Sequence, residues 1–243
     1  MKFIAIIPAR YASTRFPGKP LAMLGGKPVI ERVYEQVAGV LDDAVVATDD
    51  ERIYNAVRAF GGRVEMTSPE HRSGTDRCWE AYCRQGKEYD VVVNVQGDEP
   101  FIIPEQIESL IVRFEEPAVQ IATLAKPFEK NDEIFDPNKV KVVFSANHTA
   151  LYFSRNPIPY CRGVEREDWL AKTPFYKHVG MYAYRPEILK AVTSIPQGVL
   201  EQAESLEQLR WLENGYTIAV SITNHESIGI DTPEDLEKIK ANS

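Results

Sequence analysis

Apolar and polar residues along the first half of the chain alternate between two kinds of segment. Short apolar runs, typical of strands buried in a parallel sheet, lie at 3–7, 44–48, 63–66, 90–95 and 119–125. Between them, apolar residues recur every three or four positions, which predicts helices at 29–40, 51–60, 73–85 and 104–114. This order predicts an α/β fold with a doubly wound, mainly parallel sheet and right-handed crossovers.

The pattern changes after about residue 130. Apolar segments at 140–144, 150–153 and 178–184 predict strands of a smaller antiparallel part. Between them lies a polar excursion at 155–174, and long excursions of this kind commonly form lids, binding loops or subunit contacts. The rest of the chain predicts a helix at 200–212, a strand at 218–222 and a helix that begins at Thr232. We find no linker that would separate independent domains.

The loop after the first strand carries three cations. Arg10, Arg15 and Lys19 lie among small and turn-forming residues between Pro8 and Leu21. Arginine binds phosphate oxygens with a planar fork, lysine adds a point charge, and small residues let backbone N–H groups approach. Because ligands of open α/β sheets bind beyond the carboxyl ends of strands, we favour a polyphosphate site. A solvated basic surface is the alternative, and the loop matches neither a Walker A loop nor a G-x-G-x-x-G turn.

Two acidic residues are candidates for a metal site. Asp98 follows Gln96 and Gly97 after the apolar run at 90–95, and Asp231 precedes the predicted C-terminal helix. Mg²⁺ takes oxygen ligands, often one or two carboxylates together with substrate phosphates. We favour this role for Asp98, although aspartate is also a common turn residue. For Asp231, a role in the turn and a role as a second ligand of the same ion both stay open.

The segment 71–77 begins a predicted helix. Ser73 is a plausible N-cap with Asp76 in the first turn, and Arg72 and Arg77 flank this helix start. The free N–H groups of such a helix start can bind an anion or a polar ligand edge. The alternative is that Asp76 and Arg77 are only surface residues of the helix.

The composition of the chain restricts the kinds of partner that it can bind. The chain has 243 residues, 44% of them apolar, and a formal net charge of −8, which argues against a general affinity for nucleic acid or anionic membrane. Three cysteines without a C-x-x-C pair and four scattered histidines favour reduced thiols over disulfides or zinc. No apolar segment approaches the length of a membrane span. We therefore expect a cytoplasmic protein with no nucleic-acid partner and no stable membrane association.

Together these motifs resemble the 3-deoxy-manno-octulosonate cytidylyltransferases, also called CMP-Kdo synthetases. The first cationic loop alone occurs widely among sugar nucleotidyltransferases, whereas the combination is much more specific. The matching segments follow in family order at 7–10, 13–21, 71–77, 94–100, 178–182, 200–210 and 229–236.

The resemblance implies transfer of CMP from CTP to Kdo, an acidic eight-carbon sugar of bacterial lipopolysaccharide, with diphosphate as the other product. It also implies a Rossmann-like, GT-A-like nucleotidyltransferase fold, dependence on Mg²⁺, a cytoplasmic location and a homodimer. Residues of about 1–130 and 217–243 would form the nucleotide- and metal-binding core. Residues of about 131–216 would bind the sugar and form the dimer contact, all within a single nucleotidyltransferase domain.

The resemblance also assigns roles to individual residues. Arg10, Arg15 and Lys19 would hold the triphosphate, and Asp98 and Asp231 would hold Mg²⁺. The nucleotide pocket would further include Pro8, Arg72, Ser73, Arg77 and Gln96. The sugar pocket would include Arg155, His178, Tyr182, Gln202 and Glu207. Catalysis would rest on Arg10, Arg15, Lys19 and Asp98, which position the reactants and stabilise charge, with no general base assigned.

Three other functions stay open. The acceptor could be 8-amino-Kdo, sialic acid or another acidic sugar. A glycosyltransferase that uses a sugar nucleotide would share the sheet and the carboxylate, but it would not need cations placed for a leaving diphosphate. A nucleotide-binding module without turnover would not need paired metal-binding carboxylates.

Overall fold

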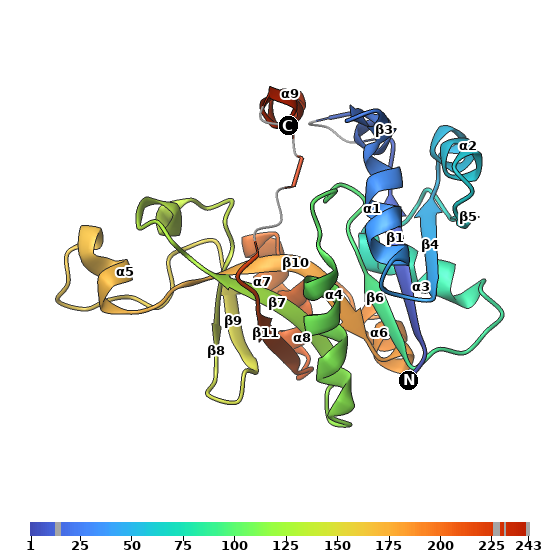
Figure 1. The fold of residues 1–243 in the computed structure, drawn as a ribbon. Helices are drawn as coiled ribbons and strands as arrows, with labels where there is room; N and C mark the ends of the chain where they lie inside the picture. Colours follow the sequence, from blue (N-terminus) through green and yellow to red (C-terminus); the bar gives the residue numbers. More distant parts are fainter. Residues whose placement is uncertain (13–15, 226–228, 231, 242–243) are drawn as a thin grey trace. The chain divides into compact units, whose positions relative to one another are not determined.

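The computed structural model describes residues 1–12, 16–225, 229–230 and 232–241 (Figure 1). The chain divides into two compact units. The first comprises Met1–Glu108, Arg185–Thr193 and Ser227–Ser243, and the second comprises Ser109–Tyr184 and Ser194–Glu226. The resemblance implies that residues 109–130 and 217–226 belong to the nucleotide-binding core. By contacts they belong to the second unit, because their strands pair with one another and with strand β10 (Tyr176–Tyr184).

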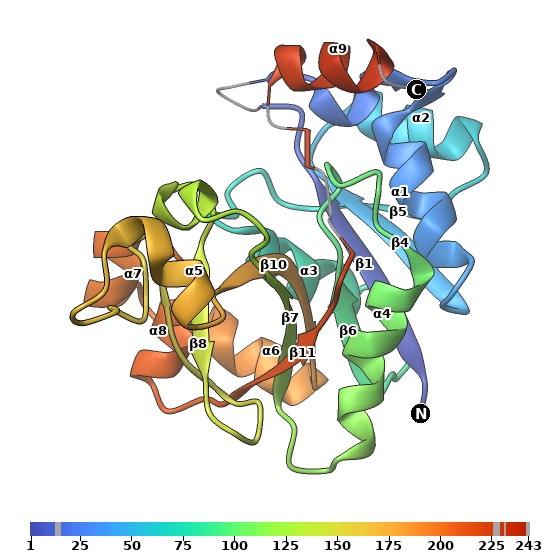
Figure 2. The ribbon, with the colours of Figure 1, turned by 60° about the vertical axis from the view of Figure 1, so that its left-hand side comes forward.

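The first unit is built on four parallel strands. Their order across the sheet is β6 (Val91–Asn94), β1 (Phe3–Ala9), β4 (Asp43–Thr48) and β5 (Val64–Met66). Helix α1 (Val29–Ala38) lies over one face of this sheet and α3 (Gly74–Cys83) over the other (Figure 2). β1 is buried from its second residue onward, as a strand covered on both faces must be.

Parallel pairing brings the carboxyl ends of three strands to one edge of this sheet. Ile6 lies opposite Asn94 of β6, and Ala9 lies opposite Thr48 of β4. The loops that follow β1, β4 and β6 therefore begin side by side. The expectation that the cationic loop and the Asp98 loop leave the same edge is confirmed.

Side-chain caps fix where the helices of the first unit begin. Ser73 and Asp76 form a capping box, in which the Asp76 N–H donates to Ser73 Oγ over 3.1 Å, so the predicted N-cap is confirmed. Asp50 caps α2 (Glu51–Ala59), and Thr232 caps α9 (Pro233–Ala241) with Asp235 as its reciprocal partner. This unit also contains the helix α6 (Pro186–Thr193), which the sequence pattern does not predict.

Several short elements join these strands and helices. In the first unit, a 3-10 turn η1 (Lys19–Leu21) and the hairpin β2 (Met23–Leu24) and β3 (Lys27–Pro28) lie between β1 and α1. Beyond β6, the chain forms α4 (Pro104–Ile111) and the 3-10 turn η2 (Val112–Glu115).

The second unit is mainly antiparallel. β10 pairs in antiparallel fashion with β7 (Ile121–Pro127) and β8 (Lys141–Phe144), and β8 pairs likewise with β9 (Ala150–Ser154). β11 (Ile218–Ile222) runs parallel to its neighbour, β7. The predicted α/β fold with a mainly parallel sheet and a smaller antiparallel part is therefore confirmed.

The polar excursion at 155–174 shares a small apolar core with residues outside it. It contains the 3-10 turn η4 (Arg166–Asp168) and the helix α5 (Trp169–Lys172), and a further 3-10 turn, η3 (Asp132–Phe135), lies earlier in the chain. Trp169 is buried among apolar residues from inside and outside the excursion, namely Phe128, Ile134, Cys161 and Phe175. The excursion is thus packed against the strands of its own unit.

The prediction of one helix at 200–212 is wrong. The segment forms two helices, α7 (Val199–Glu204) and α8 (Gln208–Glu213), separated by Ser205 in the left-handed region with φ of 52°. The break follows from competing hydrogen bonds. The Arg155 guanidinium donates to the carbonyls of Glu204 (2.6 Å) and Ser205 (3.3 Å), which a continuous helix would need for its own ladder.

Candidate active site

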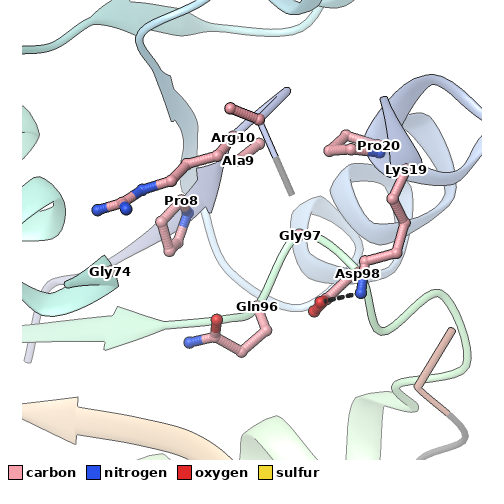
Figure 3. Close-up of a pocket in the computed structure, with 10 residues that line it drawn as sticks. Pro8, Ala9, Arg10, Lys19, Pro20, Gly74, Gln96, Gly97 and Asp98 are labelled. Carbon is pink, nitrogen blue, oxygen red and sulfur yellow. Dashed lines mark ion pairs between the residues drawn. The ribbon is translucent and has the colours of Figure 1, made fainter. Parts of the chain in front are cut away.

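A cavity of about 430 Å³ lies in the first unit beyond the carboxyl ends of β1 and β6 (Figure 3). Five of its lining residues were named from the sequence: Pro8, Arg10, Lys19, Gln96 and Asp98. The other lining residues are small or cyclic: Ala9, Ala12, Pro20, Gly74 and Gly97. The cavity wall thus carries two cations, Arg10 and Lys19, and one carboxylate, Asp98. Because the other lining side chains are small, a ligand can approach the backbone closely.

The two sides of the cavity meet in an ion pair. Lys19 Nζ lies 2.5 Å from Asp98 Oδ2 (Figure 3). The Lys19 side chain is 9% exposed, whereas that of Asp98 is 36% exposed. The ammonium is therefore held inside the wall, and the carboxylate remains within reach of solvent and of a ligand.

The Arg10 guanidinium is held by the backbone that precedes α3. Its Nη2 donates to the carbonyl oxygens of His71 and, over 3.3 Å, of Ser73. In Figure 3 this group points away from the Lys19–Asp98 pair. The pKa of Arg10 lies below its ordinary value because of burial and the nearby Arg77 charge, against the opposing charges of acidic neighbours.

The small residues in the wall allow the strand ends to come close. A Cβ on Gly97 would lie 2.9 Å from the carbonyl oxygen of Pro8, so a larger residue would push the two loops apart. Gly18 has φ of +74° and donates its N–H to the Tyr11 carbonyl over 2.8 Å. The Tyr11 ring lies under the Arg52 guanidinium, 3.2 Å from its central carbon. These contacts hold both ends of the cationic loop.

Two of the predicted nucleotide-pocket residues, Ser73 and Arg77, make hydrogen bonds to other residues of the protein. Ser73 Oγ caps α3, and its carbonyl accepts from Arg10. Arg77 is fully buried, with Nη2 at 2.7 Å from Asp49 Oδ2 and Nη1 at 2.5 Å from Thr67 Oγ1. Its charge is therefore balanced within the protein.

Arg72, a further predicted residue, is not among the residues that line the cavity. Arg72 is exposed to solvent. Arg15 and Asp231 lie outside the described residues. Among the residues that are described, no group of three or more His, Cys, Asp or Glu side chains is placed to hold a metal ion.

Two residues predicted for the sugar pocket lie together in the second unit. The rings of His178 and Tyr182, both on β10, have centroids 5.3 Å apart. Burial lowers the pKa of His178 to about 3, so its imidazole is neutral at pH 7. Burial, reinforced by the charge of Glu207, raises the pKa of Tyr182 well above its ordinary value, against a smaller lowering by the nearby Thr123 hydroxyl. The Tyr182 hydroxyl is buried and has no hydrogen-bond partner among the described residues.

The remaining predicted sugar residues occupy different settings in the same unit. Glu207 accepts from Arg210 Nη2 over 3.0 Å. Gln202 is exposed, and its Nε2 donates to the Gln197 carbonyl over 3.4 Å. The Arg155 guanidinium donates to three carbonyls, those of Pro137, Glu204 and Ser205. In this structure Arg155 therefore ties together segments that are distant in the sequence.

Three polar residues that contact Arg77, His71 and His178 are not predicted from the sequence pattern. Asp49 pairs with Arg77, Glu80 pairs with His71, and Thr123 contacts His178. The Asp49-Asp50 pair after a strand was a visible signal, since polar residues at strand ends gather at one sheet edge. Nothing in the local pattern distinguishes Glu80 on its helix or Thr123 in its strand.

Comparison with known proteins identifies the family. The model of the family described as "Cytidylyltransferase" matches residues 4–240. The chain belongs to the cytidylyltransferase family. It is therefore a nucleotidyl-transferring enzyme, and the resemblance recognised from the motifs is confirmed by the relatives that follow.

Two relatives are named 3-deoxy-manno-octulosonate cytidylyltransferase. The protein of Phocaeicola vulgatus is 64% identical over 99% of this chain and 97% of its own length. That of Parabacteroides distasonis is 63% identical over 99% of this chain and 98% of its own length.

A solved structure extends the match to three dimensions. It is described as CMP:2-keto-3-deoxy-manno-octonic acid synthetase complexed with CTP. It aligns with a TM-score of 0.92 and 44% identity, covering 100% of this chain and 98% of the other. The cytidylyltransferase fold of this chain is thus the one that the motifs predicted.

One further finding concerns membranes. No helix in the described ranges of the chain is both long enough and apolar enough to span a bilayer.

Proposed function

We propose that this cytidylyltransferase transfers CMP from CTP to Kdo and releases diphosphate. The anomeric oxygen of the sugar attacks the α-phosphorus, and the bond to the β-phosphate oxygen breaks. The observation that carries this proposal is the 63–64% identity, over 99% of the chain, to proteins named for this activity. The cavity supports it, because phosphoryl transfer asks a protein mainly to position reactants and to stabilise charge.

For the nucleotide, we propose that Arg10, Arg15 and Lys19 bind the triphosphate. Arg10 and Lys19 line the same cavity, and the Lys19 ammonium is fixed in its wall. Cations held in advance stabilise charge that develops on a leaving diphosphate without having to move into place. Pro8 and Gln96 line the cavity as well and are proposed to contact the rest of CTP, together with Arg72 and Ser73.

Arg77 takes a different part in this proposal. It is fully buried and its guanidinium is bound to Asp49 and Thr67, so we propose that it shapes the nucleotide pocket from behind. Its charge reaches Arg10, whose pKa is lowered first by burial and then by Arg77.

We further propose that Asp98 and Asp231 hold Mg²⁺. Asp98 fits this ion, because it offers a partly exposed carboxylate oxygen beside the residues proposed to bind phosphate. Ile230, which precedes Asp231 in sequence, donates its N–H to the Asp98 carbonyl over 3.2 Å. When bound, the ion would supply charge neutralisation and a lowered pKa for the attacking hydroxyl. Lys19 would then exchange its contact with Asp98 for one with phosphate.

For the sugar, we propose a pocket in the second unit formed by His178, Tyr182, Gln202 and Glu207. The buried Tyr182 hydroxyl without a partner among the described residues is the observation that favours a polar ligand there, because such groups are costly to leave unpaired. We propose that Arg155 supports this pocket through its three carbonyl contacts, which fix the break between α7 and α8.

The assembly and cellular setting are also proposals. We propose a homodimer whose contact is formed by the excursion at 155–174, in which Tyr160 is 76% exposed. Sedimentation velocity would test it, with Tyr160→Ser expected to weaken the dimer. We place the reaction in the cytoplasm, in lipopolysaccharide biosynthesis, with CTP and Kdo as substrates.

The deciding experiment measures diphosphate release with CTP and Mg²⁺ in the presence of Kdo, 8-amino-Kdo or sialic acid, with UTP and ATP as nucleotide controls. We expect release with CTP and Kdo and little with the other pairs. Release only with another acidic sugar would keep the reaction class and change the acceptor. Binding of CTP without release from any pair would contradict the proposal and favour a binding module.

A further inference from the structure

Thr123 is a fully buried polar residue of β7 that lies opposite an irregularity in β10. Val179 is paired with Leu124, and the next paired residue of β10, Tyr182, lies opposite Thr123. One step along β7 therefore corresponds to three steps along β10. Two residues of β10 have no ladder position and form a bulge.

This bulge brings His178 and Tyr182 together. Residues four apart in a regular strand are separated by about 13 Å. Here His178 lies opposite Ala125 and Tyr182 opposite Thr123, which are only two ladder positions apart and therefore on the same face. Their ring centroids are 5.3 Å apart as a result. Thr123 shares this face, at the position directly opposite Tyr182.

The Thr123 hydroxyl is placed between the bulge and the imidazole. Oγ1 lies 2.8 Å from the Met181 carbonyl oxygen, 3.3 Å from that of Val179 and 3.0 Å from His178 Nε2. A hydroxyl has one proton to donate, and a carbonyl can only accept. The shortest of these contacts, to the Met181 carbonyl, favours donation of the hydroxyl proton to the bulge, which leaves a lone pair of Oγ1 to accept a hydrogen bond from His178 Nε2–H.

The protonation of His178 follows from this arrangement. A neutral imidazole carries a single proton, and the low pKa of His178, about 3, keeps it neutral. With the proton on Nε2, Nδ1 is a hydrogen-bond acceptor. A neutral acceptor does not bind a carboxylate, but it does bind a hydroxyl.

We infer that Thr123 is a positioning residue that fixes His178 in the Nε2–H form, so that Nδ1 accepts a hydrogen bond from a hydroxyl of the sugar and not from its carboxylate group. The inference rests on the proposed place of His178 in the sugar pocket. It assigns the recognition of the sugar's negative charge to other residues. Thr123 itself touches no substrate and acts through the imidazole.

The first test is spectroscopic and needs no substrate. Protein labelled with nitrogen-15 histidine gives signals from four residues, and a His178→Asn sample identifies the signal of His178. The expected result is a proton on Nε2 and none on Nδ1 between pH 6 and pH 8. A proton on Nδ1 would overturn the inference. In Thr123→Val the Nε2 proton loses its acceptor and exchanges faster with water.

The second test separates positioning from a general loss of structure. Thr123→Val keeps the shape of the side chain and removes the hydroxyl, and we expect the KM for Kdo to rise about three- to tenfold, as for one lost hydrogen bond. The KM for CTP should stay within about twofold, and Thr123→Ser should restore the KM for Kdo. An unchanged KM for Kdo, or an equal rise for both substrates, would refute the inference.

The two tests also separate this inference from the proposed function. If the wild-type enzyme turns over no acidic sugar with CTP, the proposed function is wrong. The nitrogen-15 measurement of the His178 protonation state does not depend on turnover and still tests the role of Thr123. If Thr123→Val does not fold, the Thr123→Ser kinetics and the wild-type spectrum decide. A Thr123→Ser variant with a raised KM for Kdo despite the Nε2–H form would contradict the role of the hydroxyl.

Discussion

The ion pair between Lys19 and Asp98 joins side chains of unequal exposure, 9% and 36%. Removing one partner should therefore have a different cost from removing the other. Asp98→Asn removes a counter-charge from a nearly buried ammonium. Lys19→Met leaves a carboxylate that water can reach and places an apolar chain in a buried position.

The magnitudes follow from that asymmetry. Loss of the counter-charge to a buried group costs about 1–3 kcal/mol. We take about 1–2 kcal/mol for Asp98→Asn, because the amide oxygen still accepts a hydrogen bond and the Asp98 side is more than a third exposed, where solvent screens the pair. For Lys19→Met the same screening predicts a change of about 0.5 kcal/mol or less.

Activity should respond differently from stability. Both variants remove a group proposed to act on the triphosphate, either directly or through the metal. Removing one donor that stabilises developing charge typically costs about 3–4 kcal/mol of activation free energy. We therefore expect Asp98→Asn, Lys19→Met and Lys19→Ala each to lower kcat at least about a hundredfold.

Urea unfolding without ligands measures the stabilities, and diphosphate release with CTP, Kdo and Mg²⁺ measures kcat. The matched control is Lys27→Met. Lys27 pairs with Glu35 at the same 2.5 Å, but the two side chains are 43% and 50% exposed and lie outside the cavity. This control should leave both the stability and kcat nearly unchanged, because solvent screens an exposed pair.

Two results would refute this reasoning. If Lys19→Met destabilises the protein more than Asp98→Asn, the cost is not set by which charge is left buried. If either cavity variant keeps nearly normal turnover, that residue has no part in the mechanism.

Three further predictions concern the groups around the two pockets. Arg77→Met should destabilise by about 3 kcal/mol in urea unfolding because it breaks a buried pair, and the double variant with Asp49→Asn should be less affected than the single one. Burial raises the pKa of Glu80, but hydrogen bonds from a backbone N–H and His71 and the charge of a nearby arginine outweigh it, so the pKa lies below 4.5. The stabilisation of the fold by the Glu80 carboxylate should therefore be present above pH 4.5 and fade as the pH falls through the lower folded pKa. In urea unfolding, the stabilities of wild type and Glu80→Gln should converge there. Because the pKa of His178 is about 3 in the folded state, this imidazole takes up a proton below about pH 6.5 only in the unfolded chain. The free energy of unfolding of the wild type should therefore fall with falling pH by up to about 1.4 kcal/mol per pH unit. His178→Gln should flatten that slope.

The part of the site that the sequence predicted is the part set by the strands. The apolar run of β1 can only be a buried strand, and the residues after it must emerge at the carboxyl edge of a parallel sheet. The same holds for Gln96 and Asp98 after β6. Arg10, Lys19, Gln96 and Asp98 therefore line one cavity, as the order of motifs implied.

The part that could not be predicted depends on partners that are distant in sequence. Arg155 lies 49 residues before Glu204, yet its hydrogen bond to that carbonyl ends α7 and breaks a segment whose local pattern is helical throughout. The bulge in β10 has a local signal in Gly180, one of its two residues without a ladder position, but the hydrogen bonds that Thr123 makes to the bulge carbonyls depend on a strand distant in sequence. Local propensity is a weak prior where tertiary hydrogen bonds compete with it.

The arginines of this chain show why a motif locates a site more readily than it assigns roles. Guanidinium groups bind carbonyl oxygens and carboxylates with the same fork that binds phosphate. Arg77 is buried against Asp49, and Arg155 is bound to three carbonyls. Arg10 lines the cavity although its guanidinium also donates to two carbonyls, and Arg72 is exposed. Burial and partners, which only the fold supplies, separate arginines that hold the protein together from those placed for a ligand. An exchange to lysine keeps the charge but removes the fork, so it should cost mainly stability at Arg77 and mainly affinity for CTP at Arg10.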